Sequence, residues 1–140
     1  MTRHIAGIAE IVEDVSLAVR FYREALGLNV EHEEGAGYAL VDVQGTLHFG
    51  IWSRASAAEA TFGDPNAANR IPLGFTIGFE VDAAEAASKQ LESAGWPVAQ
   101  PPKTEPWGQV TSRFFSPSGA LCEVAETPNA RRVTQAMKAE

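Results

Sequence analysis

The chain has 140 residues, 45% of them hydrophobic, and a formal net charge of −7, a composition typical of one globular domain. The negative charge argues against a nucleic-acid partner, because phosphate binding requires stretches of lysine and arginine. No apolar run approaches the roughly 18 residues of a membrane span, and the single cysteine, Cys122, allows no internal disulfide. We therefore expect a cytoplasmic protein without a membrane partner.

The first half of the chain predicts a strand, a helix and three further strands. In residues 9–31, AEIVEDVSLAVRFYREALGLNVE, an apolar strand is followed by Asp14, a candidate N-cap, and the helix ends before Gly27. After a β-branched strand, the runs GYALVDV and TLHFGIWS predict two more strands. The apolar stripe of the helix comprises Val15, Ala18, Val19, Tyr22, Ala25 and Leu26.

The second half repeats this order. In residues 78–100, GFEVDAAEAASKQLESAGWPVAQ, Asp82 and Gly95 occupy the places that Asp14 and Gly27 hold in the first half. Glu85 completes a box-like Asp-x-x-Glu pattern at the start of the second helix. The runs VTSRFF and ALCEVAE then predict strands, so each half reads as a β-α-β-β-β module.

These patterns divide a single domain, residues 1–140, into four parts. Module one covers about residues 5–53, a linker about 54–72, module two about 73–126 and a C-terminal tail about 127–140. The linker is rich in Ala, Asn, Gly and Pro, and it is either a flexible connector or a flap over a pocket. The tail either forms a short helix against a second subunit or frays.

Four segments, FYREALG, GFEVD, PWGQ and SPSGALCEV, occur in this order within about residues 5–126. Together they resemble the vicinal oxygen chelate superfamily of glyoxalases, bleomycin-resistance proteins and extradiol dioxygenases. The resemblance implies an α+β fold whose two modules form a cupped, incomplete mixed-strand barrel around one pocket. It also implies a homodimer, because an open cup leaves strand edges that a second chain covers. Such a fold hosts several chemistries, so it does not by itself define the function.

The resemblance also implies four positions at which metal-dependent members carry ligands. These positions fall on Gly7, Thr76, Glu123 and, within one residue, His48. Glycine offers no side chain, and a threonine hydroxyl is a poor ligand beside imidazole or carboxylate. Since a usable site needs about three protein ligands, we expect no metal cofactor. The alternative is a divalent metal such as Zn, Fe, Ni or Co, held by His48 and Glu123.

Glu123 lies in the apolar run LCEV, where an unpaired buried carboxylate costs several kcal/mol, in order of magnitude. We expect it to face the interior of the cup, with His48, Thr76, water or a cationic ligand as its partner. Glu123 and His48 are therefore the catalytic candidates. Alternatively, Glu123 is a structural residue satisfied by its neighbours. The other two histidines, His4 and His32, are expected at the surface.

Aromatic side chains are abundant on the strands that would form the cup, although such residues are more often core than ligand platforms. The segment EPWGQ resembles the part of bleomycin-resistance proteins that borders their drug groove, which places Trp107 at the rim. The remaining ligand-binding candidates are Trp52, Thr76, Phe49 and Phe114.

Two classes of function fit these residues, so the sequence does not decide whether the protein is an enzyme. The first is a metal-free protein that binds a small aromatic or cationic molecule in an apolar cup. The alternative is a metal-dependent lyase, isomerase or ring-cleaving dioxygenase that acts on vicinal oxygens through His48 and Glu123. A variant of the second class is metal-free proton transfer by Glu123.

Overall fold

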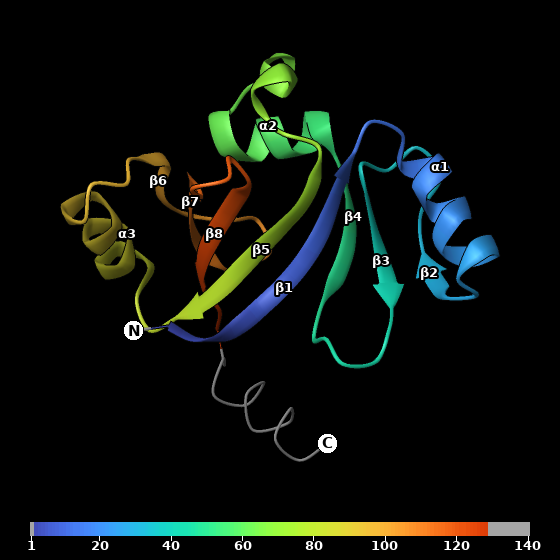
Figure 1. The fold of residues 1–140 in the computed structure, drawn as a ribbon, viewed down its shortest axis with the longest axis horizontal. Coiled ribbons are helices and arrows are strands. Elements are labelled where there is room, and N and C mark those ends of the chain that lie inside the picture. The colour runs from blue at the N-terminus through green and yellow to red at the C-terminus, as the bar shows by residue number, and fades with distance from the viewer. Residues whose placement is uncertain (1, 129–140) are drawn as a thin grey trace.

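The computed structural model of the chain describes residues 2–128 and contains one eight-stranded sheet built from two similar halves (Figure 1). The first half consists of β1 (Thr2–Val12), α1 (Val15–Arg20), the π-helical turn η1 (Phe21–Ala25), β2 (Asn29–Glu31), β3 (Tyr38–Asp42) and β4 (Phe49–Ser53). The second consists of β5 (Gly74–Val81), α3 (Ala84–Ser93), β6 (Val98–Thr104), β7 (Val110–Phe115) and β8 (Leu121–Glu126). The α+β class and the two β-α-β-β-β modules are confirmed.

The strand order is β2-β3-β4-β1-β5-β8-β7-β6, so the two modules join through β1 and β5 at the centre. β1 and β5 are antiparallel, whereas β1 pairs with β4 and β5 with β8 in parallel. Figure 1 shows α1 and α3 on opposite outer flanks of the sheet and α2 across one end. Apolar clusters beneath α1 and α3 line the outer side, which leaves the concave side of the sheet free for a site.

The two helix starts differ from each other. The Asp14 carboxylate accepts a hydrogen bond of 3.1 Å from the Leu17 N–H, so the expected N-cap of the first helix is confirmed. The same expectation for Asp82 is wrong, because α3 begins one residue later, with Ala83 at the N-cap, and the first helical N–H, that of Ala84, donates to Oε1 of Glu126 at 3.0 Å. The Asp82 carboxylate instead accepts a 2.5 Å hydrogen bond from Arg3 at the start of β1.

The predicted stripe of the first helix is correct only for its first half. Val15, Val19 and Tyr22 are buried, and the Tyr22 hydroxyl donates a 2.5 Å hydrogen bond to Glu10 on β1. Ala25 and Leu26 are exposed. The five-residue segment from Phe21 to Ala25 is π-helical, and its wider turn rotates the later side chains away from the buried face.

The linker is not a flexible connector. It folds into α2 (Arg54–Phe62) and the 3₁₀ helix η2 (Pro65–Arg70). Ala57, Ala58 and Ile71 are fully buried against the concave end of the sheet. The Ala60 carbonyl accepts hydrogen bonds from Lys103 and Arg113, which fix the C-terminal turn of α2 to module two.

The expected C-terminal helix lies outside the described residues, apart from the first residues of the tail. Within residues 2–128, no helix has the length and hydropathy needed to cross a membrane.

Candidate functional site

The floor of the concave face is a pair of glycines. The register of β1 and β5 sets Gly7 directly opposite Gly78. A Cβ atom on Gly7 would lie 3.2 Å from the Cβ of His48, and one on Gly78 would lie 3.1 Å from Oε1 of Glu123. Both glycines therefore leave room for these two side chains rather than providing a left-handed backbone, and the backbone of the two glycines separates His48 from Glu123.

A cavity of about 940 Å³ opens above this floor. It brings together residues from both modules and from the loop after β6. Among the candidates chosen from the sequence, those that line it are His48, Trp52, Thr76, Trp107 and Glu123. Trp107 is 59% exposed, which places it at the edge of the cavity rather than in its depth.

Phe49 and Phe114 do not line the cavity, and the expectation that they would is wrong. Phe49 packs on the outer side, with its ring centroid 5.5 Å from that of Tyr22 beneath α1. Phe114 packs in the cluster beneath α3. The reason is strand alternation: Trp52 on β4 and Arg113 on β7 face the cavity, so residues of opposite parity face outward.

His4 also departs from expectation, because it lines the cavity. The register of β1 and β5 shifts between Ile5 and Gly7, which resets the alternation on which a surface position was predicted. The Nε2 atom of His4 is buried and has no hydrogen-bond partner among residues 2–128. His32 is half-buried, with Nε2 3.2 Å from the Ala36 carbonyl oxygen.

Glu123 faces the cavity, and its protein partner is neither His48 nor Thr76 but the strand neighbour Arg113, which fits the alternative that Glu123 is satisfied by its neighbours. Its Oε2 atom lies 3.0 Å from Nη2 of Arg113, and the side chain is 23% exposed. The Thr76 hydroxyl instead donates to the Leu121 carbonyl. Burial raises the pKa of the Glu123 carboxyl, and the charges of Glu105 and Glu80 add to this rise, while Arg113 opposes it.

Arg113 is almost fully buried, at 2% exposure, between two carboxylates. Besides Glu123 it contacts Glu105, with Nη1 3.0 Å from Oε1, and it donates to the side-chain carbonyl of Gln100. Its guanidinium lies over the Trp52 ring, 5.3 Å from the centroid. Sequence reasoning missed this residue, although an arginine inside the strand run VTSRFF was a signal that a buried charge needed a partner.

His48 lies one residue before β4 and pairs with Tyr38, which sequence reasoning also missed. The Tyr38 hydroxyl and His48 Nε2 form a hydrogen bond, and their rings stack with centroids 5.9 Å apart. Gly50 makes this possible, because a Cβ there would lie 2.0 Å from the Tyr38 hydroxyl oxygen. Burial lowers the pKa of His48, and burial together with the charge of Glu123 raises the pKa of Tyr38, so both rings favour their neutral forms.

A series of hydrogen bonds lies at the end of the cavity away from the His48–Tyr38 pair. The Trp107 indole N–H donates to Oε1 of Gln109 at 2.7 Å, and Nε2 of Gln109 donates to the Thr127 hydroxyl at 2.8 Å. The Thr127 hydroxyl donates to Oε1 of Glu80, whose Oε2 accepts the Thr127 backbone N–H at 2.8 Å. Glu80 is 2% exposed, so this series connects an exposed ring to a buried carboxylate.

The positions at which the resemblance implies metal ligands do not form a metal site. Gly7 has no side chain, Thr76 is engaged with a carbonyl, and Glu123 is paired with Arg113. No group of three or more His, Cys, Asp or Glu residues within the described part of the chain is arranged to hold a metal ion. His48 and Glu123 alone are too few for a site of usable affinity.

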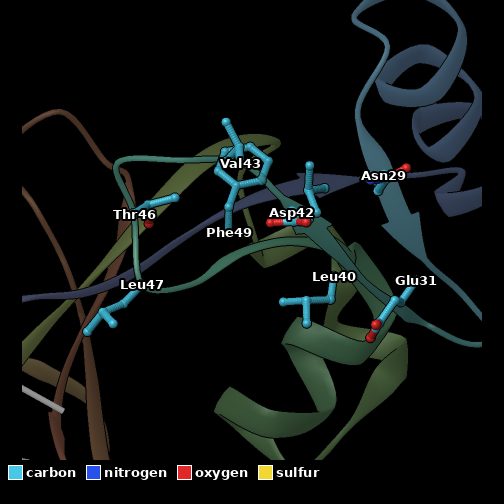
Figure 2. Close-up of a pocket in the computed structure, with 9 residues that line it drawn as sticks. Asn29, Glu31, Leu40, Asp42, Val43, Thr46, Leu47 and Phe49 are labelled. Atoms are coloured by element: carbon cyan, nitrogen blue, oxygen red, sulfur yellow. The ribbon is translucent and has the colours of Figure 1, made fainter. Parts of the chain in front are cut away.

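A second cavity, of about 390 Å³, lies at the β3–β4 hairpin (Figure 2). Figure 2 shows Val43 and Phe49 on one side of the hairpin and Leu47 on the other. Leu47 lines both cavities, so the hairpin loop forms the wall between them. Glu31 and Asp42 add carboxylates to this smaller space, which is separate from the glycine floor.

Two β-α-β-β-β modules that share one sheet and enclose a cavity on its concave face define the paired-module cup fold. The family model of the Glyoxalase/Bleomycin resistance protein/Dioxygenase superfamily matches residues 4–124, and the chain belongs to this superfamily. No protein with a curated description matches the chain.

Solved structures share the fold at low sequence identity. Methylmalonyl-CoA epimerase from Mycobacterium tuberculosis is 19% identical, with a TM-score of 0.63 over 94% of this chain and 93% of that one. NAD-dependent benzaldehyde dehydrogenase from Legionella pneumophila is 16% identical, with a TM-score of 0.61 over 87% and 98%. A hypothetical protein from Bacillus halodurans C-125 is 17% identical, with a TM-score of 0.63 over 89% and 94%. At these identities the likeness concerns the fold alone.

Proposed function

We propose that the cup binds a small, flat organic molecule that carries a positive charge or a hydrogen-bond donor, and that it does so without a metal. The observation that carries this proposal is the cavity of about 940 Å³ above the Gly7–Gly78 floor, which has His48 against one glycine and the Glu123 carboxylate against the other. Trp52 and Trp107 supply aromatic surface around this floor. A concave, mostly apolar site with a few convergent polar groups is typical of small-molecule binding.

The proposal is tested with two probes of the same shape, the cation 1-methylquinolinium and its neutral isostere 1-methylnaphthalene. Binding is followed by quenching of tryptophan fluorescence and by calorimetry. We expect the cation to bind about tenfold more tightly than the isostere, and Trp107→Ala to remove most of the quenching. Equal affinities, or no saturable binding of either probe, would overturn the proposal.

A second candidate is metal-free proton transfer, which is favoured by the opposite pKa shifts across the floor. Burial raises the pKa of Glu123 and lowers that of His48, which brings an acid and a base toward the same pH range. The fold is shared with methylmalonyl-CoA epimerases, so methylmalonyl-CoA is a reasonable first substrate. Chelator-treated protein in D₂O should then catalyse exchange of the α-proton of methylmalonyl-CoA for deuterium. Glu123→Gln should abolish this exchange. Absence of exchange leaves the binding function alone.

The donor set argues against the metal-dependent alternative. Metal analysis of protein purified without chelators should find far less than one equivalent of Zn, Fe, Ni or Co. One equivalent that is lost in Glu123→Gln would favour the alternative instead.

We further propose that the protein is a cytoplasmic homodimer. Large apolar side chains remain exposed on and beside the two central strands, among them Ile5 at 47%, Leu73 at 52% and Phe75 at 56%. A second chain would cover them, and the free, buried Cys122 suits a reducing compartment. Light scattering should give twice the chain mass of 15.0 kDa, and Phe75→Glu should shift it to one chain mass.

A further inference from the structure

We propose that the positive charge of the ligand is held at the end of the cavity formed by Trp107 and Glu80, and not at Glu123. This inference rests on the proposed binding function and specifies how the ligand is oriented. The flat part of the molecule then lies over the Gly7–Gly78 floor, and its charged group lies on the face of the Trp107 indole.

The charge of Glu123 is already compensated. Arg113 lies 3.0 Å from it, and Arg113 is further held by Glu105 and Gln100. A ligand cation at Glu123 would compete with this buried guanidinium, which keeps its other partners and does not leave. A second cation beside Arg113 would also suffer like-charge repulsion in a site of low dielectric.

Arg113 also occupies the aromatic face of Trp52. The Arg113 guanidinium lies over the Trp52 ring, 5.3 Å from its centroid, which is within the range of a cation–π contact. The indole of Trp107 carries no such cation among the described residues, and it is 59% exposed at the edge of the cavity. The aromatic face open to a ligand cation is therefore that of Trp107.

Glu80 supplies the charge at this end. Both of its oxygens accept hydrogen bonds from Thr127, which is how an ionised carboxylate bonds, and none of residues 2–128 forms an ion pair with it. Among residues 2–128, the ion pairs of the neighbouring Glu105 and Glu123 come from Arg113 and from the partly exposed Lys103, which lies 3.8 Å from Glu105. Within this described part of the chain Glu80 has no compensating cation, and a ligand cation would supply one.

Thr127 and Gln109 are positioning residues in this scheme. Their hydrogen bonds fix the indole plane of Trp107 relative to the Glu80 carboxylate. An exposed ring that is held in one orientation loses less conformational entropy when a ligand stacks on it. The hydrogen bonds from Trp107 through Gln109 and Thr127 to Glu80 therefore favour a flat cation over a cation of the same charge that has no planar ring.

The test uses three probes: 1-methylquinolinium, the neutral 1-methylnaphthalene and the saturated cation N,N-dimethyldecahydroquinolinium. The charge preference is the affinity ratio of the first to the second, and the flatness preference is the ratio of the first to the third. We expect Glu80→Gln to lower the charge preference about tenfold and Glu123→Gln to lower it by less than about threefold. Gln109→Glu adds a carboxylate at the same end and should raise it, which keeps the test valid if Glu80→Gln fails to fold.

Thr127→Val should lower the flatness preference several-fold and speed solvent exchange of the Trp107 indole N–H, read by NMR, while Thr127→Ser should behave as the wild type. A charge preference that falls more in Glu123→Gln than in Glu80→Gln would overturn the orientation. If Thr127→Val changed neither the flatness preference nor the solvent exchange rate of the Trp107 indole N–H, the positioning role of Thr127 and Gln109 would be overturned. A wild-type protein with no charge preference would instead overturn the proposed function itself, and this inference with it.

Discussion

The two walls of the glycine floor occupy equivalent places in the two modules but carry different chemistry. His48 precedes β4 and lies against Gly7 of β1, and Glu123 of β8 lies against Gly78 of β5. On the first wall, His48 and Tyr38 form a neutral pair. On the second, Glu123 belongs to a buried group of charges. The repeated backbone therefore fixes where a side chain lies, while its strand neighbours determine whether it is charged.

The largest difference between the walls should be in stability. Arg113→Met leaves Glu105 and Glu123 without their buried cation and should cost about 3–5 kcal/mol of unfolding free energy. Tyr38→Phe removes only a neutral hydrogen bond on the first wall and should cost about 1 kcal/mol. Urea unfolding of the two variants measures both. Equal losses of unfolding free energy would show that the buried charges contribute no more to stability than the neutral pair does.

The helices that support the two walls should differ next. Tyr22→Ala in module one removes a buried ring and should cost about 2–4 kcal/mol. Leu91→Ala in α3 is the matched change in module two and should cost less, because Leu91 is only partly buried. Tyr22→Phe, which keeps the ring and loses the hydrogen bond to Glu10, separates packing from bonding. An unchanged melting temperature in Tyr22→Ala would mean that module one does not depend on this contact.

The floor itself should respond unequally to one added methyl group. In Gly7→Ala the new Cβ meets the His48 carbonyl oxygen at 3.3 Å, and backbone yields little, so we expect a loss of about 1–3 kcal/mol. In Gly78→Ala it meets the flexible end of Glu123, which can move, so the loss should stay below about 1 kcal/mol. Thermal unfolding of both variants provides the comparison, and a larger loss in Gly78→Ala would contradict it.

The smallest expected difference is the response to pH, which has opposite signs on the two walls. The pKa of His48 is lowered by folding, so the unfolded chain takes up its proton first and stability is lost as pH falls through the histidine range. The pKa of Glu123 is raised, so the folded chain takes up its proton first and stability is gained as pH falls. Each effect is worth about 1.4 kcal/mol per unit of pKa shift.

Melting temperatures at about pH 7.5 and about pH 5 separate these two effects. His48→Gln should reduce the loss of stability in acid, and Glu123→Gln should increase it. Changes of the same sign in both variants would show that the two walls are not electrostatically opposed.

The fold was predictable because its signals are local and occur twice. The Asp14 cap, the helical stripe around Val19 and the glycines after both helices each act within a few residues. The errors arose where one residue of offset mattered. Asp82 lies one residue before the N-cap of α3, which is Ala83. The register shift on β1 makes the His4 side chain face the cavity.

The candidate site was predictable only in part, because its polar partners come from distant strands. Glu123 and His48 could be placed from the resemblance, but Arg113 and Tyr38 contact them across neighbouring strands. Strand alternation gives the face of a side chain but not the residue that lies opposite, which depends on register. The Glu80–Thr127 contact joins β5 to the segment after β8, and no local pattern announces it.

The pairing of β1 with β5 has a consequence for the order of folding. Within each module the pairing partners are nearer in sequence, as Ile8 of β1 is to Phe49 of β4, whereas Gly7 and Gly78 meet only across the whole first module and the linker. Closing so long a loop costs entropy that is recovered only when both partners are already ordered. We therefore expect the floor of the cavity to be the last part of the sheet to form. Refolding followed by probes in the helices should run ahead of refolding followed by probes at the floor.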